Sequence, residues 1–444
     1  MRKGRSASAC SAKDTPGCRS TIREPLSGKR CVARTKKGTA TMFSHEDHAN
    51  AVERLEYSER QVDLLTRIRE LGDRRIGPAA KQTDRDGAYP QAGIDALREA
   101  DLIGLAVPEP YGGRGAGFQG DVVLLVLALM ELASYCSSTS QVFALHNTGV
   151  QLIHAMGDEK QKRHFFDDVL RGNLFASFGS EANASRFALA STLRKTDGGF
   201  ILNGKKIFAT GSPGAKWAFW RSVSDDAHGN QEERYMMPVV LLSAPGVAVA
   251  DDWDGMGQRG TGSGTVTADN VFVPELHIMG GPGDYSRHAP FFASQFHIHF
   301  AAQFVGIATG AYREALRYVK EKARSWSDAK SAAEDPVTQL RVGDMAAKLA
   351  AARQLVLRAA RLLQAYNDRP ELQAAVHVAA SHAKIVATET SLDITNSVFQ
   401  VMGARAATRA YGFDMYYRNA RTLTLHDSVD KQRETVGKYE LGLV

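Results

Sequence analysis

His426 and Asp427 stand next to each other near the C-terminus and are the first pair of residues that could carry chemistry. An imidazole can hold or release a proton near neutral pH, so His426 is a candidate proton relay. A neighbouring carboxylate can orient such a ring, or can itself accept a proton. A single histidine close to a helix end is more often structural, so the pair needs a surrounding site before a role follows.

A second group of residues gathers aromatic rings and two histidines in one short stretch. His297 and His299 occur among five phenylalanines, namely Phe291, Phe292, Phe296, Phe300 and Phe304. The spacing of two residues points the histidines to different faces of a helix, which argues against a metal pair. The stretch therefore predicts an aromatic wall, and no metal is expected.

Cysteine and glycine patterns exclude other chemistries. Three of the four cysteines lie within the first 41 residues, so the predicted body of the chain has Cys136 alone and no disulfide framework or cysteine-ligated metal. The run from Gly260 to Gly264 superficially resembles a dinucleotide-binding loop. It precedes a predicted strand and opens no helix, so the helix terminus that binds phosphate is missing.

Three zones must position these residues. Residues 44–172 have helical periodicity, broken by a loop rich in proline and glycine at 107–113. Residues 173–286 favour strands, with a hairpin predicted at 200–208 and Asn203-Gly204 as its two-residue turn. Residues 287–444 return to helix, where one apolar stripe consists of Met345, Leu349, Ala352, Val356, Ala359 and Leu363.

The first 43 residues form a separate basic head. Eleven Lys and Arg and two acids fall within residues 1–41, whereas the whole chain carries a net charge of +6, so the remainder is mildly acidic. We expect this head to be disordered, and we interpret it as a start site placed too early, with Met42 as initiator; a transit peptide is the alternative.

The acidic body gives no reason to expect nucleic acid. The apolar run 122–133 is too short to cross a bilayer, so we expect a cytoplasmic protein.

Several strings resemble the acyl-CoA dehydrogenase superfamily. They are Pro108-Glu-Pro-Tyr-Gly-Gly113, Gly157-Asp-Glu-Lys-Gln161, Asn203-Gly-Lys-Lys-Ile-Phe-Ala-Thr-Gly211, Gly257-Gln-Arg-Gly-Thr-Gly-Ser263 and Val271-Phe-Val-Pro274. The resemblance covers about residues 50–444. It implies a mainly α fold with an N-terminal helical domain, a middle β-barrel-like domain and a C-terminal four-helix bundle. It also implies a homotetramer in which neighbouring subunits complete the flavin site.

A departure at the C-terminal motif changes the implied chemistry. His426-Asp427 stands where dehydrogenases of the family have Tyr-Glu, and aspartate is one methylene shorter than the glutamate base. The run from Tyr417 to Lys431 is instead similar to the flavin monooxygenases of this fold, the dibenzothiophene monooxygenase-like group. In that group, reduced FMN from a separate flavin reductase reacts with O₂ to give a flavin hydroperoxide, which oxygenates a small sulfur, amine or aromatic substrate.

The resemblance assigns cofactor residues in two sets. One set backs the flavin ring and comprises Phe178, Gly179, Ser180, Asn183, Phe208, Ala209 and Thr210. The other comprises Arg324, Ala404 and Arg405, in segments that lack the glycines with which FAD-binding members hold the pyrophosphate and adenosine. The two arginines remain to pair with one phosphate, so FMN is expected. His426 would face the flavin and relay a proton, Asp427 would orient it, and Thr210 would donate near the ring.

Two alternatives remain open from the sequence. One is an FAD-dependent acyl-CoA dehydrogenase, or a nitroalkane-oxidase-like enzyme, with Asp427 as the base. The other is a catalytically silent scaffold. The group's His and Tyr on the helix around residues 141–146 are absent here, where Gln141 and Leu145 stand, so the substrate is not expected to be dibenzothiophene.

Overall fold

The computed structural model describes residues 45–182 and 189–443. Met1–Val52 and Glu53–Val444 form two separate units, and the architecture below is that of the second. The predicted basic head, residues 1–43, and the predicted cofactor residue Asn183 lie outside the described residues.

The N-terminal region is helical. Its helices are α1 (His45–Glu56), α2 (Glu59–Leu71), a π-helical turn (Gly72–Ile76), α3 (Gly77–Asp86), α4 (Gln91–Glu99), α5 (Val122–Tyr135), α6 (Ser137–Met156) and α7 (Glu159–Leu170). Capping boxes start α2 at Ser58 and α7 at Asp158, each with a glutamine three residues later. Every residue of α5 is buried, which explains its uniformly apolar sequence.

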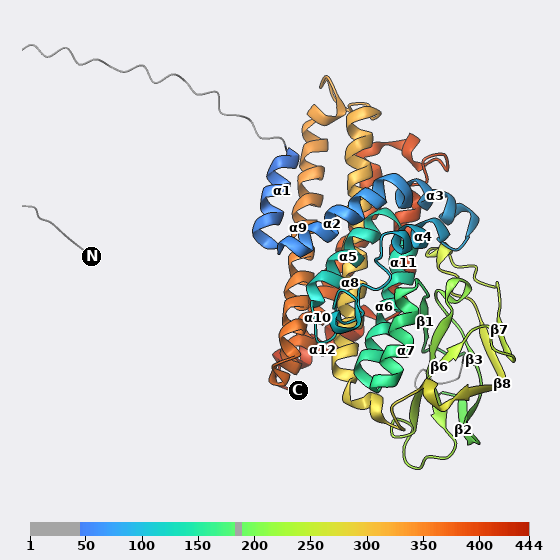
Figure 1. Cartoon of the computed structure of the whole chain (residues 1–444). Helices are drawn as coiled ribbons and strands as arrows, with labels where there is room; N and C mark the ends of the chain where they lie inside the picture. Colours follow the sequence, from blue (N-terminus) through green and yellow to red (C-terminus); the bar gives the residue numbers. More distant parts are fainter. Residues whose placement is uncertain (1–44, 183–188, 444) are drawn as a thin grey trace, which may run out of the picture. The chain divides into compact units, whose positions relative to one another are not determined.

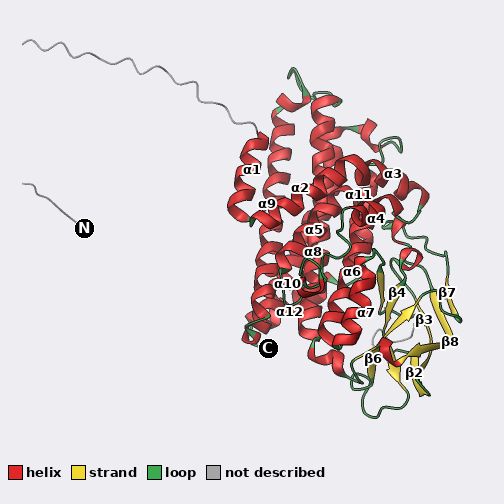
Figure 2. Ribbon diagram, in the orientation of Figure 1, coloured by secondary structure: helices red, strands yellow, loops and turns green. Residues whose placement is uncertain are grey.

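A nine-stranded sheet follows (Figure 2). Its strands are β1 (Phe175–Phe178), β2 (Thr192–Thr196), β3 (Gly199–Lys206), β4 (Trp217–Trp220), β5 (Ser222–Ser224), β6 (Tyr235–Leu241), β7 (Val247–Val249), β8 (Val266–Pro274) and β9 (Ile278–Met279). The order is β1-β4-β6-β5-β2-β3-β8-β7, with β9 on β6. The β1–β4 and β2–β5 pairs are parallel, and the other pairs are antiparallel.

The hairpin predicted around Asn203-Gly204 is wrong. Residues 199–206 form the single strand β3, and the chain turns instead at residues 197–198, between β2 and β3. Asn203 lies at a register shift where β3 meets β8, and its side-chain oxygen accepts the backbone N–H of Asn270. A Cβ on Gly204 would lie 2.1 Å from the Ser191 hydroxyl. The Asn-Gly pair therefore marks a bulge at a close approach, which uses the same residue types as a tight turn.

The C-terminal region is a bundle of long helices (Figure 1). These are α8 (Ala289–Glu321), α9 (Pro336–Tyr366), α10 (Gln373–Met402), α11 (Asp414–Thr424) and α12 (Val429–Glu440). The predicted stripe on α9 is confirmed, because five of its six members are buried and Leu349 packs against the core. One continuous apolar core joins these helices to the N-terminal ones, and a second lies within the sheet.

Helices α5 and α8 approach each other closely at two glycines of α8. A Cβ on Gly306 would lie 2.3 Å from the carbonyl oxygen of Met130, and one on Gly310 would lie equally close to that of Ser134. No side chain fits at either position, so the two backbones pack directly together. Within residues 45–182 and 189–443, no helix is long and apolar enough to cross a membrane.

Candidate active site

His426 follows the C-terminal end of α11 and lies on an aromatic surface of α8. The centre of its ring is 4.9 Å from that of Phe296 and 4.6 Å from that of Phe300. Its backbone N–H donates to the carbonyl of Leu423, which continues the last turn of the helix. The residue itself is exposed. The imidazole is thus held by packing while part of it stays accessible.

Asp427 is buried, and its carboxylate is directed into the bundle. The Oδ2 atom lies 3.0 Å from Nε2 of His297 and accepts a 2.8 Å hydrogen bond from Gln432. Gln432 in turn accepts a hydrogen bond from Ser381 of α10. These contacts fix the carboxylate among α8, α10 and α12. This arrangement favours a role for Asp427 in anchoring the chain next to His426. A catalytic base would need a carboxylate that is free to reach the substrate.

The predicted segment from Phe208 to Thr210 leaves the end of β3 in an unusual conformation. Phe208 has a φ of +55°, and its side chain is 57% exposed despite being a large aromatic ring. Ala209 is fully buried, and its N–H donates to the carbonyl of Gly264. An exposed phenyl ring on a strained backbone is costly for an isolated protein. Both features are expected if a flat ligand covers the ring.

A chain of hydrogen bonds links Thr210 to helix α11. The Thr210 hydroxyl lies 2.6 Å from that of Ser263, which lies 2.6 Å from that of Thr261. Thr261 donates to the carbonyl of Gln258. The N–H of Gln258 donates to Oδ1 of Asn419 at 2.6 Å. The β-domain segment and the helix that ends before His426 are therefore held in register through buried polar contacts.

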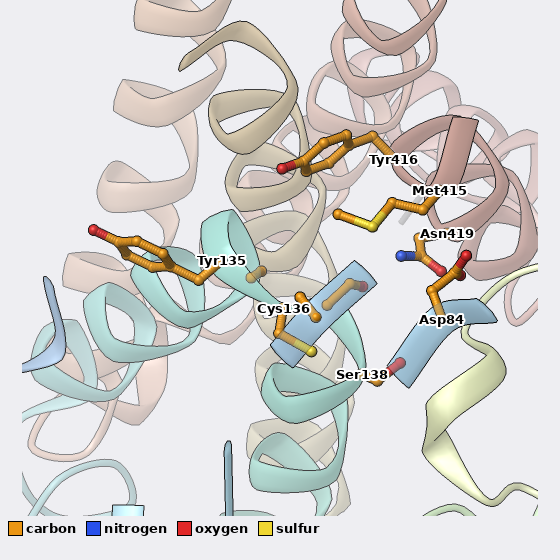
Figure 3. A pocket seen from close by; sticks show the side chains of 10 residues that line it. Asp84, Tyr135, Cys136, Ser138, Met415, Tyr416 and Asn419 are labelled. Carbon is orange, nitrogen blue, oxygen red and sulfur yellow. The ribbon is translucent and has the colours of Figure 1, made fainter. Parts of the chain in front are cut away.

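Asn419 also lines a small cavity between α3, the start of α6 and α11 (Figure 3). Asp84 and Cys136 lie on its other sides, and burial raises the pKa of the Cys136 thiol. The cavity has a volume of about 10 Å³. That space can hold one water molecule. The cavity is therefore a small gap in the packing of these helices and is too small for a substrate.

The upstream predicted residues have different environments. Phe178 belongs to the sheet core, where its ring packs edge-to-face on Trp220 at 5.7 Å, so its side chain offers almost no exposed surface. Gly179 and Ser180 are exposed. A Cβ on Gly179 would meet nothing within 4 Å, and the carbonyl of Ser180 accepts the N–H of Ile207. Open backbone therefore lies directly beside the Phe208 segment.

A buried ion pair holds these two segments together. The ammonium of Lys206 lies 2.5 Å from Glu181, and both side chains are almost fully buried. Burial alone would raise the pKa of Glu181, but hydrogen bonds from Lys206 and Ser191 outweigh it and lower that pKa to about 2. Sequence reasoning missed this pair, because the two residues lie on segments whose pairing is set by the sheet and no local pattern signals it.

The second predicted set lies at another end of the bundle. Arg324 is in the connection after α8, and Ala404 and Arg405 are in a 3₁₀ turn after α10 (Ala404–Ala407). All three are exposed. The two segments adjoin, since a Cβ on Gly403 would lie 3.9 Å from the ring of Trp326. From Phe300 to the end of α8 is about 30 Å at 1.5 Å per residue, so these residues lie far from His426 in the same chain.

Buried polar atoms with unmet hydrogen bonds lie between α6 and α8. Gln295 of α8 donates to Gln151 of α6, and one or two turns further along the two helices stand Asn147, His299 and Gln303. Within the part of the chain that the structure describes, no partner reaches Asn147 Oδ1, His299 Nε2 or Gln303 Oε1. Burial lowers the pKa of His299 to about 3, so its ring is neutral. Such groups are rarely left unsatisfied, and a buried water or a polar ligand is their usual further partner.

His146, in contrast, is structural. Its Nε2 lies 2.8 Å from the carbonyl of Ile103, and its Nδ1 accepts the N–H of Phe175. Burial lowers its pKa to about 4, so the ring is neutral with the proton on Nε2. It joins α6 to a loop and to β1. Among residues 45–182 and 189–443, no cluster of three His, Cys, Asp or Glu side chains could hold a metal ion.

Comparison with known proteins identifies the class. Residues 58–173, 179–271 and 298–431 match the N-terminal, middle and C-terminal domains of acyl-CoA dehydrogenase, respectively. The chain belongs to the acyl-CoA dehydrogenase family, as the order of its helical and β regions predicts.

Individual relatives define the branch of the family. Dibenzothiophene monooxygenase of Rhodococcus erythropolis is 33% identical over 82% of this chain and 89% of that protein. The probable FMNH₂-dependent monooxygenase SfnC of Pseudomonas putida is 32% identical over 85% and 94%. The structure of FMN-bound TdsC from Paenibacillus sp. A11-2 matches with a TM-score of 0.81 at 29% identity, covering 86% and 98%. The protein is thus an oxidoreductase, a flavin monooxygenase of this fold.

Proposed function

We propose that this protein is the oxygenase of a two-component system that uses reduced FMN and O₂ to add one oxygen atom to a small organosulfur, amine or aromatic substrate. A separate flavin reductase would supply the reduced FMN, and we infer a cytoplasmic reaction. The observation that carries the proposal is the pair His426 and Asp427, in which the imidazole stays accessible while the carboxylate is anchored in the bundle. Relatives whose names specify FMN or FMNH₂ support the choice of cofactor.

The residues present fit a flavin with one phosphate. The exposed ring of Phe208 and the open backbone at Gly179 offer a surface for a flat ring system. The Thr210 hydroxyl, held by Ser263, could donate to an atom of that ring. Arg324 and Arg405 have the charge to bind a phosphate, and alanine at 404 does not give the backbone freedom that a diphosphate clamp needs. When bound, reduced FMN supplies the electrons that activate O₂.

One flavin cannot contact both predicted sets within one chain. The ring-binding segment and His426 are joined by hydrogen bonds through Gln258 and α11, whereas the arginines lie about 30 Å along α8 from Phe300. We therefore propose that Arg324, Ala404 and Arg405 of one chain complete the site of a second copy. This arrangement requires a homo-oligomer, and a homotetramer is the form that we propose.

The chain's own residues would contribute three actions. His426 would hold or donate a proton at its accessible ring nitrogen, since an imidazole exchanges protons near neutral pH. Phe296 and Phe300 would shield one side of that imidazole from water, which protects reactive species. Asn147, His299 and Gln303 would bind polar groups of the substrate between α6 and α8.

The dehydrogenase alternative has less support from the geometry. It requires Asp427 to reach a substrate carbon, but the carboxylate already accepts a hydrogen bond from Gln432 and contacts His297 in the bundle. Removing it from these partners would leave buried polar groups unpaired, which is unfavourable.

Purified protein tests the proposal directly. It should require an added flavin reductase, NADH and FMN, and it should transfer one atom of isotopically labelled O₂ into a thioether, sulfone, amine or indole. Mass spectrometry of the product measures that transfer. Tightly bound FAD together with oxidation of an acyl-CoA by an electron acceptor would contradict the proposal.

A further inference from the structure

Lys384 is a charged residue in the middle of the helical bundle. Its side chain on α10 has no exposed surface, and Nζ finds no hydrogen-bond partner among the residues that the structure describes. Lysine is rarely buried without a partner, because an ammonium ion loses its hydration. Burial lowers the pKa of Lys384 to about 8, and the negative charge of Asp427 opposes that effect. Because this burial is unfavourable, we expect Lys384 to have a role other than filling space in the core.

The contacts of the ammonium are the faces of two phenyl rings. Nζ lies 4.7 Å from the centre of Phe300 and 5.2 Å from that of Phe304. A cation is attracted to the face of an aromatic ring, and the attraction is larger where water is excluded. The lysine therefore restrains the position and tilt of Phe300.

Phe300 is also the ring on which His426 packs. Its centre is 4.6 Å from the imidazole centre, so the same phenyl ring contacts the buried ammonium and the accessible imidazole. Helix α10 also contributes to the hydrogen bonds that hold Asp427, the residue after His426. Ser381, almost one turn before Lys384, donates to Gln432, which donates to Asp427. Helix α10 thus contributes contacts on the side of both His426 and Asp427.

We propose that Lys384 is a positioning residue for His426 and acts through the ring of Phe300. The inference rests on the proposed function, in which His426 handles a proton beside the flavin. Lys384 would touch neither substrate nor cofactor. Its loss would let Phe300 change its tilt, so the imidazole would occupy several orientations and the proton would be delivered less efficiently.

Lys384→Met is the informative variant. It keeps an unbranched side chain of similar length and removes a buried charge, which a core often tolerates well. Lys384→Arg retains the cation and should restore much of the wild-type behaviour. Lys216→Met is the control for loss of a cation–π contact away from His426, because Nζ of Lys216 lies 5.3 Å from the ring of Trp217 in the β-domain, where it also pairs with Asp168.

The first measurement needs no flavin. Diethyl pyrocarbonate modifies accessible histidines, and mass spectrometry can compare the rate at His426 with the rate at the exposed His228 in the same sample. We expect Lys384→Met to raise the relative rate at His426 by about two- to thirtyfold, the range that corresponds to losing a cation–π contact. Lys216→Met should leave the rate unchanged. Equal rates in Lys384→Met and wild type would overturn the proposal, whatever the melting temperature.

The second measurement uses the complete system. Lys384→Met should release more hydrogen peroxide per NADH consumed, with KM for the substrate unchanged, because the substrate contacts are intact. Adding Lys384→Met to Phe300→Leu should give no further loss, since Lys384 acts only through that ring; fully additive losses would contradict the proposal. If Lys384→Met does not fold, Phe300→Leu alone should raise the modification rate of His426, and an unchanged rate would overturn the idea.

Failure of the two proposals can be told apart. A wild-type protein that oxygenates no substrate contradicts the proposed function, yet the modification rates in flavin-free protein still report whether Lys384 orders His426.

Discussion

The Lys206 ammonium and the Glu181 carboxylate form a buried ion pair, 2.5 Å long, between β3 and the segment after β1. The same ammonium donates to the carbonyl of Arg221, and the same carboxylate accepts the Ser191 hydroxyl. The residues that directly follow Lys206 carry the predicted flavin-ring contacts. The pair therefore fixes the surface on which the flavin would rest.

Breaking this pair from one side should strongly destabilise the protein. Lys206→Met leaves a buried carboxylate without its cation, and we expect a loss of about 3–5 kcal/mol in the free energy of unfolding. Urea unfolding followed by circular dichroism measures it. Lys431→Met removes an exposed pair with Glu434 and should leave the value nearly unchanged. Equal effects of the two variants would show that the buried pair has no special role.

Acid should destabilise the protein through Glu181. The pKa of this carboxyl is about 2 in the folded protein against an ordinary value of 4.5, so the folded protein binds the proton less readily than the unfolded chain does. The stabilisation is present above pH 4.5 and is lost as the pH falls toward 2. Glu181→Gln should flatten the unfolding free energy over that range. A curve parallel to that of wild type would contradict the assignment.

His426→Ala should uncouple oxygen consumption from product formation. NADH oxidation continues, whereas the oxygenated product falls by about 10²- to 10⁴-fold, the usual contribution of a general acid or base, and hydrogen peroxide accumulates. Peroxide and product are measured together. His228→Ala, at an exposed position in the β-domain, is the control. Unchanged coupling in His426→Ala would remove this residue from the mechanism.

Arg405→Ala should weaken FMN binding by about ten- to a hundredfold, the value of a hydrogen bond to a charged group. If the arginine serves a second copy, co-expressed Arg405→Ala and His426→Ala chains should form hybrid sites with both residues intact. Random association predicts about a quarter of wild-type activity. Hybrids no more active than either parent would place both residues in one chain's site.

His299→Leu should separate stability from substrate affinity. Its Nε2 is buried without a partner in the described part of the chain, so an apolar replacement removes an unsatisfied group and should not lower the melting temperature. KM should rise for substrates that bind through polar groups, whereas FMN affinity should stay constant. A lower melting temperature with unchanged KM would assign His299 a structural role.

The sequence predicted the order of regions well, because apolar periodicity and turn residues are local signals. The stripe on α9 lies where expected, and so does β8, the strand predicted to follow Gly264. The Asn203-Gly204 hairpin was wrong because a bulge and a turn require the same residue types, and only the contact with Ser191 and β8 distinguishes them. The placement of Phe178 in the sheet core likewise depends on its parallel partner Trp220.

The site was only partly predictable for the same reason. His426 and Asp427 were proposed from one contiguous motif. Lys384, Gln432 and Ser381 lie on other helices, and no local pattern distinguishes a lysine that supports an imidazole from one that faces solvent. The ion pair of Glu181 and Lys206 similarly becomes visible only when β1, β3 and their connections are assembled.

The glycine-mediated approach of α5 to α8 bears on how this scaffold could be re-engineered. Gly306 and Gly310 place backbone against backbone, so the helices before and after the sheet depend on each other's backbone positions. Recombination between homologous oxygenases should therefore tolerate exchange of the β-domain more readily than exchange of either helical part alone. A library with crossovers at residues 173 and 286 should yield more folded chimeras than one that separates α5 from α8.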